Sequence, residues 1–220
     1  MTSPATLPDA EQAEVDVEAT RRRLTARQAE VVANLVRAAE EETEEVGYAG
    51  LTVRGVARRA GVAPATAYTY FSSKDHLLAE VLWRRMEVLP PADTATGVPM
   101  PERVERTIRA MIPFAGESTD LIDACTIALI SPSPDVAHLR DRIGALTHRR
   151  LEAAVGSGVD PRVVRILEAS YSGALLAAGT GHRSFHDIPA FVADAAGLLV
   201  AGATSAPPAK ASSARKGARR

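Results

Sequence analysis

Two histidines near the C-terminal end of the chain, His182 and His186, have a spacing that could bind a metal ion. Imidazoles four residues apart on a helix lie on the same face and can share one ion. Gly179, Gly181 and Pro189 surround the pair, however, and they favour a loop between two helices. Because a loop does not hold the imidazoles at helical spacing, we expect no metal site here.

Cys125 is the only cysteine, and it lies in an apolar segment without a basic neighbour in the sequence that would stabilise a thiolate. We therefore expect a small core hydrophobe rather than a redox sensor. The chain has no P-loop, no G-x-S-x-G sequence, no Rossmann glycine pattern and no zinc-finger spacing. We expect no catalytic residue and no cofactor, and the sequence does not favour an enzyme.

The stretch from Thr52 to Phe71, TVRGVARRAGVAPATAYTYF, has instead the spacing of a helix-turn-helix, a motif that binds DNA. Such a motif needs a small residue where its two short helices touch, and a glycine in the turn between them. Ala57 and Gly61, four residues apart, meet these two requirements. The positions that close the wedge between the helices are also apolar: Val56, Ala60, Val62, Ala67 and Tyr70.

In a helix-turn-helix the second helix enters the major groove, where base pairs differ in their hydrogen-bond donors and acceptors. We expect Thr66 and Thr69 to contact base edges or phosphates. A threonine methyl group, or Ala65, could meet a thymine methyl group. Tyr70 is expected to place its ring in the core and its hydroxyl near a phosphate, whereas we interpret Tyr68 as a core residue.

The run from Gly47 to Leu78 resembles the DNA-binding region of TetR-family regulators. The shared pieces, in order, are Gly47-Tyr48, Leu51-Thr52-Val53, Val56-Ala57, Ala60-Gly61-Val62 and the stretch YTYFSSKDHLL. The resemblance covers about residues 25–85, and the rest is similar to the family only in size and helicity.

Two departures from the family pattern affect the second helix of the motif. Ala63-Pro64-Ala65 stands where family members often carry Ser with Lys or Gly, and Ala67 stands where a larger aliphatic residue is usual. We therefore expect a slightly looser core and fewer direct hydrogen bonds to bases, with specificity depending partly on DNA shape.

The resemblance implies further DNA contacts outside this helix. Thr52 and Arg54 would contact the DNA backbone or flanking bases, and Lys74 would neutralise a phosphate; such contacts position the protein and do not specify sequence. Arg58 and Arg59 either reach DNA or form a solvated face of their helix. Residues 21–23, three arginines, form either an arm that reaches DNA or a solvated charge run.

The elements that must position these residues are helices, because apolar residues recur at helical spacing and no run of alternating β-branched residues suggests a strand. We predict an all-α fold. Gly47 is expected to end the first helix as a left-handed cap, and Ser72 with Asp75 to open the fourth as a capping box. The expected helices are 25–46, one from Thr52 to Gly61, one after Pro64, one through Met86, 102–115, 118–130, 134–155, 161–178 and 187–202.

Charge and composition divide the chain into four segments. Residues 1–24 are predicted to be a disordered arm, whose first 20 residues carry five acids and no base. A three-helix helix-turn-helix head (25–88) and a larger helical body (89–202) follow, and residues 203–220 form a disordered tail with five bases and no acid. Net charge is −1, so overall charge neither favours nor excludes nucleic acid. The acidic N-terminus, the single cysteine and the lack of about 18 unbroken apolar residues favour a cytoplasmic protein without a membrane span.

The body is expected to form a homodimer and to bind a ligand. In the resembled family the last two helices commonly build a four-helix dimer bundle, and here both are rich in alanine and glycine; alternatively, these small residues pack only inside one subunit. The candidates for a ligand pocket are core residues by default: Met111, Phe114, Cys125, Leu129, His148, Leu167 and Tyr171.

We therefore predict a dimeric repressor that binds double-stranded DNA at a palindromic operator and is released by a small apolar ligand. Two alternatives stay open. One is a DNA-binding regulator without a small-molecule effector, either gated by a protein partner or constitutive. The other is an enzyme or carrier that uses the helical body.

Overall fold

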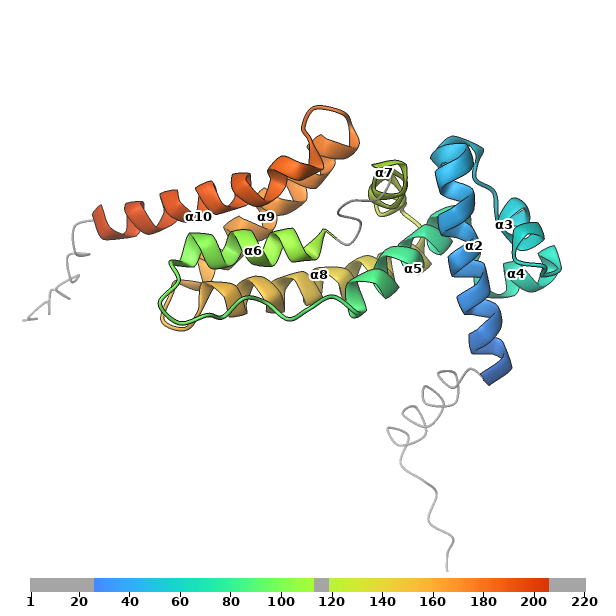
Figure 1. The fold of residues 1–220 in the computed structure, drawn as a ribbon, viewed down its shortest axis with the longest axis horizontal. Coiled ribbons are helices and arrows are strands. Elements are labelled where there is room, and N and C mark those ends of the chain that lie inside the picture. Colours follow the sequence, from blue (N-terminus) through green and yellow to red (C-terminus); the bar gives the residue numbers. More distant parts are fainter. Residues whose placement is uncertain (1–25, 113–118, 206–220) are drawn as a thin grey trace, which may run out of the picture. The chain divides into compact units, whose positions relative to one another are not determined.

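The structure is a computed structural model that describes residues 26–112 and 119–205 (Figure 1). Within these ranges every regular element is a helix, so the predicted all-α fold is confirmed. The predicted N-terminal arm, Phe114 and residues 206–220 of the predicted tail lie outside the described residues. The elements are α2 (Ala26–Gly50), α3 (Val53–Arg59), α4 (Pro64–Tyr70), α5 (Lys74–Glu87), α6 (Met100–Met111), α7 (Thr119–Ala128), α8 (Pro134–Val155), α9 (Pro161–Gly179), the 3-10 helix η1 (Phe185–Asp187) and α10 (Ile188–Ser205).

The described chain divides into two compact units. The first unit consists of residues 26–84 and 119–140, and the second unit of residues 85–112 and 141–205. Helix α7 therefore belongs with the helix-turn-helix, although its residues were expected in the body. The reason is its packing: α7 lies against α2, and it buries Leu121, Ala124 and Cys125 in the first unit. Helical periodicity shows that α7 has an apolar face, but it does not identify the helix that covers this face.

The core of the first unit contains side chains of α2, α3, α4, α5 and α7. Helix α2 buries residues at helical spacing, among them Leu35, Ala38 and Ala39, because only one of its faces is apolar. Helix α3 packs against α2, and α4 packs against α3 (Figure 1). Val56 and Ala67 are fully buried in these contacts, so α4 approaches α3 through an alanine and the two short helices lie close together.

The second unit is built around α10, which packs against α6 and α9. Its core is apolar and includes Val104, Ile108 and Ile188. Four of the small residues expected at a dimer interface are instead buried inside the subunit: Ala174, Ala178, Ala193 and Ala196. The segment Phe185–Gly202 has the length and composition of a membrane span, with 28% of it buried, so the described residues contain one such candidate.

Two predicted helix caps differ in detail from the structure. Gly47 has the expected positive φ of 63°, but its ψ is 179° and the helix continues after this kink to Gly50. Ser73, not Ser72, caps α5, since its Oγ accepts a hydrogen bond from the backbone N–H of His76 at 3.0 Å. The Ser72 hydroxyl is used elsewhere: it donates to Asp135 Oδ2 at 2.6 Å.

Candidate nucleic-acid interface

The turn between α3 and α4 has the geometry that the sequence predicts. Gly61 has a φ of +66°, a left-handed conformation in which a side chain is strained. Its N–H donates to Arg58 O at 3.2 Å, and the N–H of Val62 donates to Ala57 O at 2.9 Å. These two bonds form a Schellman motif, which satisfies the last carbonyls of α3 and sets the direction in which α4 starts.

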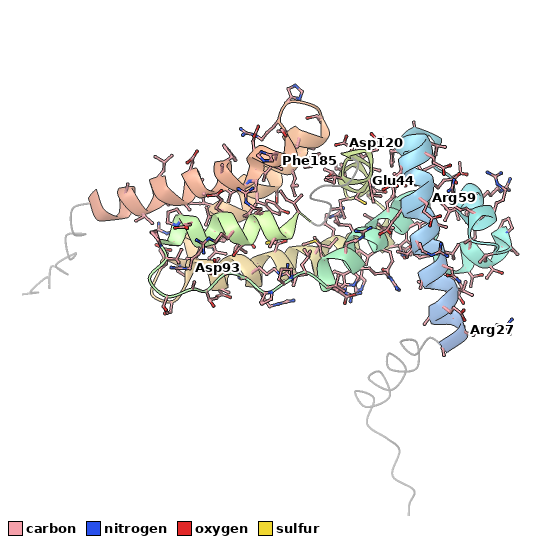
Figure 2. All side chains as sticks on the ribbon, viewed as in Figure 1. Arg27, Glu44, Arg59, Asp93, Asp120 and Phe185 are labelled. Carbon is pink, nitrogen blue, oxygen red and sulfur yellow. The ribbon has the colours of Figure 1, made fainter. Side chains whose placement is uncertain are left out.

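A partly buried ion pair links α3 to α2. Figure 2 shows Arg59 on α3, beside α2. The Nε of Arg59 lies 2.7 Å from Glu42 Oε2, and its Nη1 donates to Glu45 Oε1 at 2.9 Å. The hydrogen bond from Arg59 lowers the pKa of Glu45, and the bonds to Glu45 and Glu42 raise the pKa of Arg59. A Cβ at Gly55 would lie 2.7 Å from Glu42 Oε1, so glycine leaves room for this carboxylate.

Helix α4 exposes almost all of its surface. Ala67 is its one fully buried residue, while Ala65, Thr66 and Thr69 are exposed and Tyr70 is half-buried. The interpretation of Tyr68 as a core residue is wrong, because 47% of its surface is exposed. Helix α4 has seven residues and packs through Ala67 alone, so the next position, Tyr68, points away from the core. This position next to Ala67 is the signal in the sequence that could have identified Tyr68 as exposed.

The threonine hydroxyls of the interface differ in what they can still bind. Thr52 caps α3, and its Oγ1 accepts the Gly55 N–H at 3.0 Å, so its own O–H is left to donate to a phosphate. Thr69 donates to Ala65 O at 3.1 Å, which leaves its oxygen to accept from a base amino group. Thr66 forms no side-chain hydrogen bond among the described residues and can do either.

The charge of this surface suits a polyanion. Residues 51–74 contain four basic residues and no acidic one. Arg54 and Arg58 are exposed, and no carboxylate of the described residues pairs with either, whereas Arg59 is held by α2. The structure therefore distinguishes the two adjacent arginines. The side chain of Arg58 is free to contact DNA, whereas that of Arg59 holds α3 against α2.

Lys74 makes contacts that the sequence did not predict. Its Nζ donates to Tyr48 O at 2.7 Å and lies 4.0 Å from the centre of the Tyr48 ring. The Tyr48 hydroxyl in turn donates to Asp75 Oδ1 at 2.7 Å. Burial, together with this bond to Asp75, raises the pKa of Tyr48 to about 12. Lys74 therefore joins the end of α2 to the start of α5, and its contact with phosphate stays a prediction.

A polar cluster at the end of α4 joins it to the first turn of α8. The carboxylate of Asp135 accepts from the Ser72 hydroxyl and lies 3.8 Å from Nδ1 of His76. The Ser72 N–H donates to the same Nδ1 at 3.3 Å, and the ring of Phe71 packs edge-on against that of His76. Burial lowers the pKa of His76, although the carboxylates of Asp135 and Glu80 oppose this effect.

The residues predicted to bind a ligand do not fall in one unit. Cys125, in α7, and Leu129, just after α7, belong to the first unit, and the Cys125 Sγ lies 3.5 Å from Leu78 O. The other described residues of this set belong to the second unit, and His148 is exposed there, with its Nδ1 2.9 Å from Glu168 Oε1. Ligand binding by these residues stays a prediction; those buried in the second unit are Met111, Leu167 and Tyr171.

The fold and this surface together define a helix-turn-helix transcriptional regulator. Residues 35–81 match the bacterial regulatory proteins of the tetR family. The chain is 43% identical over 200 residues to an uncharacterized HTH-type transcriptional regulator of Mycobacterium tuberculosis, an alignment that covers 90% of this chain and 92% of the relative. The chain therefore belongs to the tetR family of transcriptional regulators.

Two further comparisons add to this family assignment. The HTH-type transcriptional repressor KstR of Mycolicibacterium smegmatis is 31% identical over 116 residues, which is 51% of this chain and 56% of KstR. The crystal structure of a TetR transcriptional regulator from Rhodococcus sp. RHA1 superposes with a TM-score of 0.65 at 22% identity, covering 80% of this chain and 98% of that one. The second similarity extends the shared fold over most of the chain.

Proposed function

We propose that this protein is a dimeric repressor that binds a palindromic operator through α4 and is released by a small ligand. The observation that carries this proposal is the exposed face of α4, with Thr66, Tyr68 and Thr69, next to the unpaired Arg54 and Arg58. Hydroxyl groups and a phenol can read base edges or phosphates, and the two guanidinium groups can neutralise phosphates. This division of roles places the specific contacts on α4 and the positioning contacts on α3.

The dimer is supported by an apolar surface on α9 and α10, which pack against each other. Ile166 and Leu176 on α9 are 45% and 49% exposed, and Phe191 and Leu198 on α10 are 37% and 76% exposed. Gly173 lies between the two α9 residues, and a Cβ there would meet nothing within 4 Å. A second copy, related by a two-fold axis, would cover this surface and bring a second helix-turn-helix to the operator.

The repressor assignment is supported by the similarity to KstR, which extends over about half of the chain. The assignment of a cytoplasmic location follows from the need to reach the bacterial chromosome. Release by a ligand requires that the ligand bind one spacing of the two DNA-binding regions better than another. The alternative is a regulator without a small effector, and it keeps the same DNA-binding surface.

The test is selection of binding sites for the full chain from random double-stranded DNA, followed by footprinting on the selected sequence. We expect a palindromic footprint. The double variant Thr66→Ala, Thr69→Ala should weaken binding about tenfold or more, because each lost hydrogen bond costs about 0.5–1.5 kcal/mol. The control is Thr94→Ala, Thr96→Ala, which removes two exposed threonines outside the helix-turn-helix. Unchanged affinity of the first variant would exclude these threonines as base-reading residues.

A further inference from the structure

The second unit contains one buried formal charge among its described residues, the guanidinium of Arg150 on α8. Arg150 is 9% exposed, and the side chains buried in the same unit are otherwise apolar apart from two threonines and Tyr171. A buried cation is unfavourable unless a partner compensates it. In the first unit, for comparison, the buried carboxylate of Glu42 is paired with Arg59. No carboxylate of the described residues pairs with Arg150.

The hydrogen bonds of Arg150 leave one nitrogen unused. Its Nη2 donates to Leu89 O at 2.9 Å and to Met86 O at 3.4 Å, near the C-terminal end of α5, where the helix dipole favours a cation. Its Nη1 is shielded from solvent and has no partner among the described residues. Arg103 of the same unit offers a contrast, because its Nε, Nη1 and Nη2 each donate to a backbone carbonyl.

Tyr171 does not supply the missing negative charge. The side chain of Tyr171 lies near enough to interact electrostatically with Arg150. Burial raises the pKa of its hydroxyl, so the phenol stays neutral. A guanidinium carries donors only, and the unused Nη1 therefore needs an acceptor from outside the described residues, for which a carboxylate is the strongest geometric and electrostatic match.

We propose that Arg150 anchors an interior ligand site in the second unit, and that this site takes a carboxylate carried on an apolar body. The carboxylate accepts a hydrogen bond from Nη1, and the apolar part lies among the apolar side chains of the unit. This inference rests on the proposed ligand response and specifies the ligand's chemistry. It also changes the expectation of a purely apolar effector, because an alkane-like ligand would leave the Arg150 charge uncompensated.

The experiment compares carboxylates with matched neutral molecules. Octanoate, decanoate, dodecanoate and palmitate are each titrated into the full chain below their critical micelle concentrations, beside the corresponding methyl esters. Binding is measured by calorimetry and by the shift in melting temperature. We expect at least one acid to bind about tenfold or more tightly than its ester, as a charge-assisted hydrogen bond allows. Equal binding of acid and ester, or no binding of any acid, would overturn the proposal.

Variants assign the preference to Arg150. The preference for the acid should disappear in Arg150→Met and persist in Arg149→Met, which removes the adjacent, exposed arginine of the same helix. Circular dichroism and the ligand-free melting temperature establish whether Arg150→Met folds, and Arg150→Lys, which keeps the charge, should retain part of the preference. A folded Arg150→Met that still prefers the acid would mean that Arg150 only caps α5, and the proposal would be wrong.

DNA binding is measured separately in the same samples. An acid that binds through Arg150 and also weakens operator binding supports both the site and the ligand response. An acid that binds through Arg150 without affecting operator binding supports the site and contradicts ligand release. Operator binding by a protein that takes up no acid leaves the DNA-binding function intact and overturns the site.

Discussion

Adjacent arginines on α3 give the sharpest test at the scale of single residues. Arg58 is exposed and unpaired among the described residues, so Arg58→Ala should reduce the slope of log affinity against log salt by about one and leave the melting temperature unchanged. Arg59→Ala should instead lower the melting temperature, because Glu42 would stay buried without its partner. Both quantities are measured for both variants, by binding at several salt concentrations and by thermal unfolding.

The two variants are controls for each other, since they remove the same group at neighbouring positions. A reduced salt slope in a folded Arg59→Ala, with an unchanged slope in Arg58→Ala, would reverse the assignment. The sequence alone could not make this distinction. Both arginines lie in the last turn of α3, after its apolar residues. Only the position of Glu42 and Glu45 on α2 determines which arginine is paired.

At the scale of helices, most of the architecture follows from local rules. The starts of α8 and α9 could be predicted because proline after a capping residue marks the first turn of a helix. Asp160 caps α9, and its bonds to Arg162 lower the pKa of Asp160 to about 2. The helix-turn-helix could be predicted because Gly61 and Ala57 satisfy steric requirements within a few residues. The helix against which α7 packs could not be predicted, because burial of α7 against α2 depends on packing between segments distant in the sequence.

The junction between α4, α5 and α8 predicts a pH dependence of stability. Burial, and the Ser72 N–H donated to Nδ1, favour the neutral form of His76 in the folded protein. The unfolded chain therefore binds the proton first as pH falls below about 6.5, and the free energy of unfolding decreases over this range. His76→Gln should flatten the decrease in melting temperature between about pH 7 and pH 5.

His138→Gln is the matched control for this junction, because His138 is an exposed histidine of α8. Its profile should follow that of the unsubstituted protein. If the two variants gave the same profile, the carboxylates of Asp135 and Glu80 would offset the effect of burial on His76. If His76→Gln steepened the decrease, protonated His76 would be stabilised by these carboxylates more than burial disfavours it. The cluster would then strengthen on acidification, opposite to the expected direction.

At the scale of the whole molecule, we expect the exposed apolar surface of α9 and α10 to determine whether the protein binds a palindrome as a dimer. Leu198 is 76% exposed, and a two-fold axis would bring this surface against its own copy, so one substitution acts twice in the dimer. Leu198→Glu should weaken dimerisation by about tenfold or more, because it places two carboxylates in an apolar contact. Val88→Glu, at a valine that is 81% exposed outside α9 and α10, should leave dimerisation unchanged. Sedimentation velocity over a range of concentrations measures dimerisation of both variants.

Operator affinity should fall with Leu198→Glu but not with Val88→Glu, since a monomer contacts one half-site. A monomeric unsubstituted protein that still binds the full palindrome tightly would show that the operator, and not this surface, brings the two copies together.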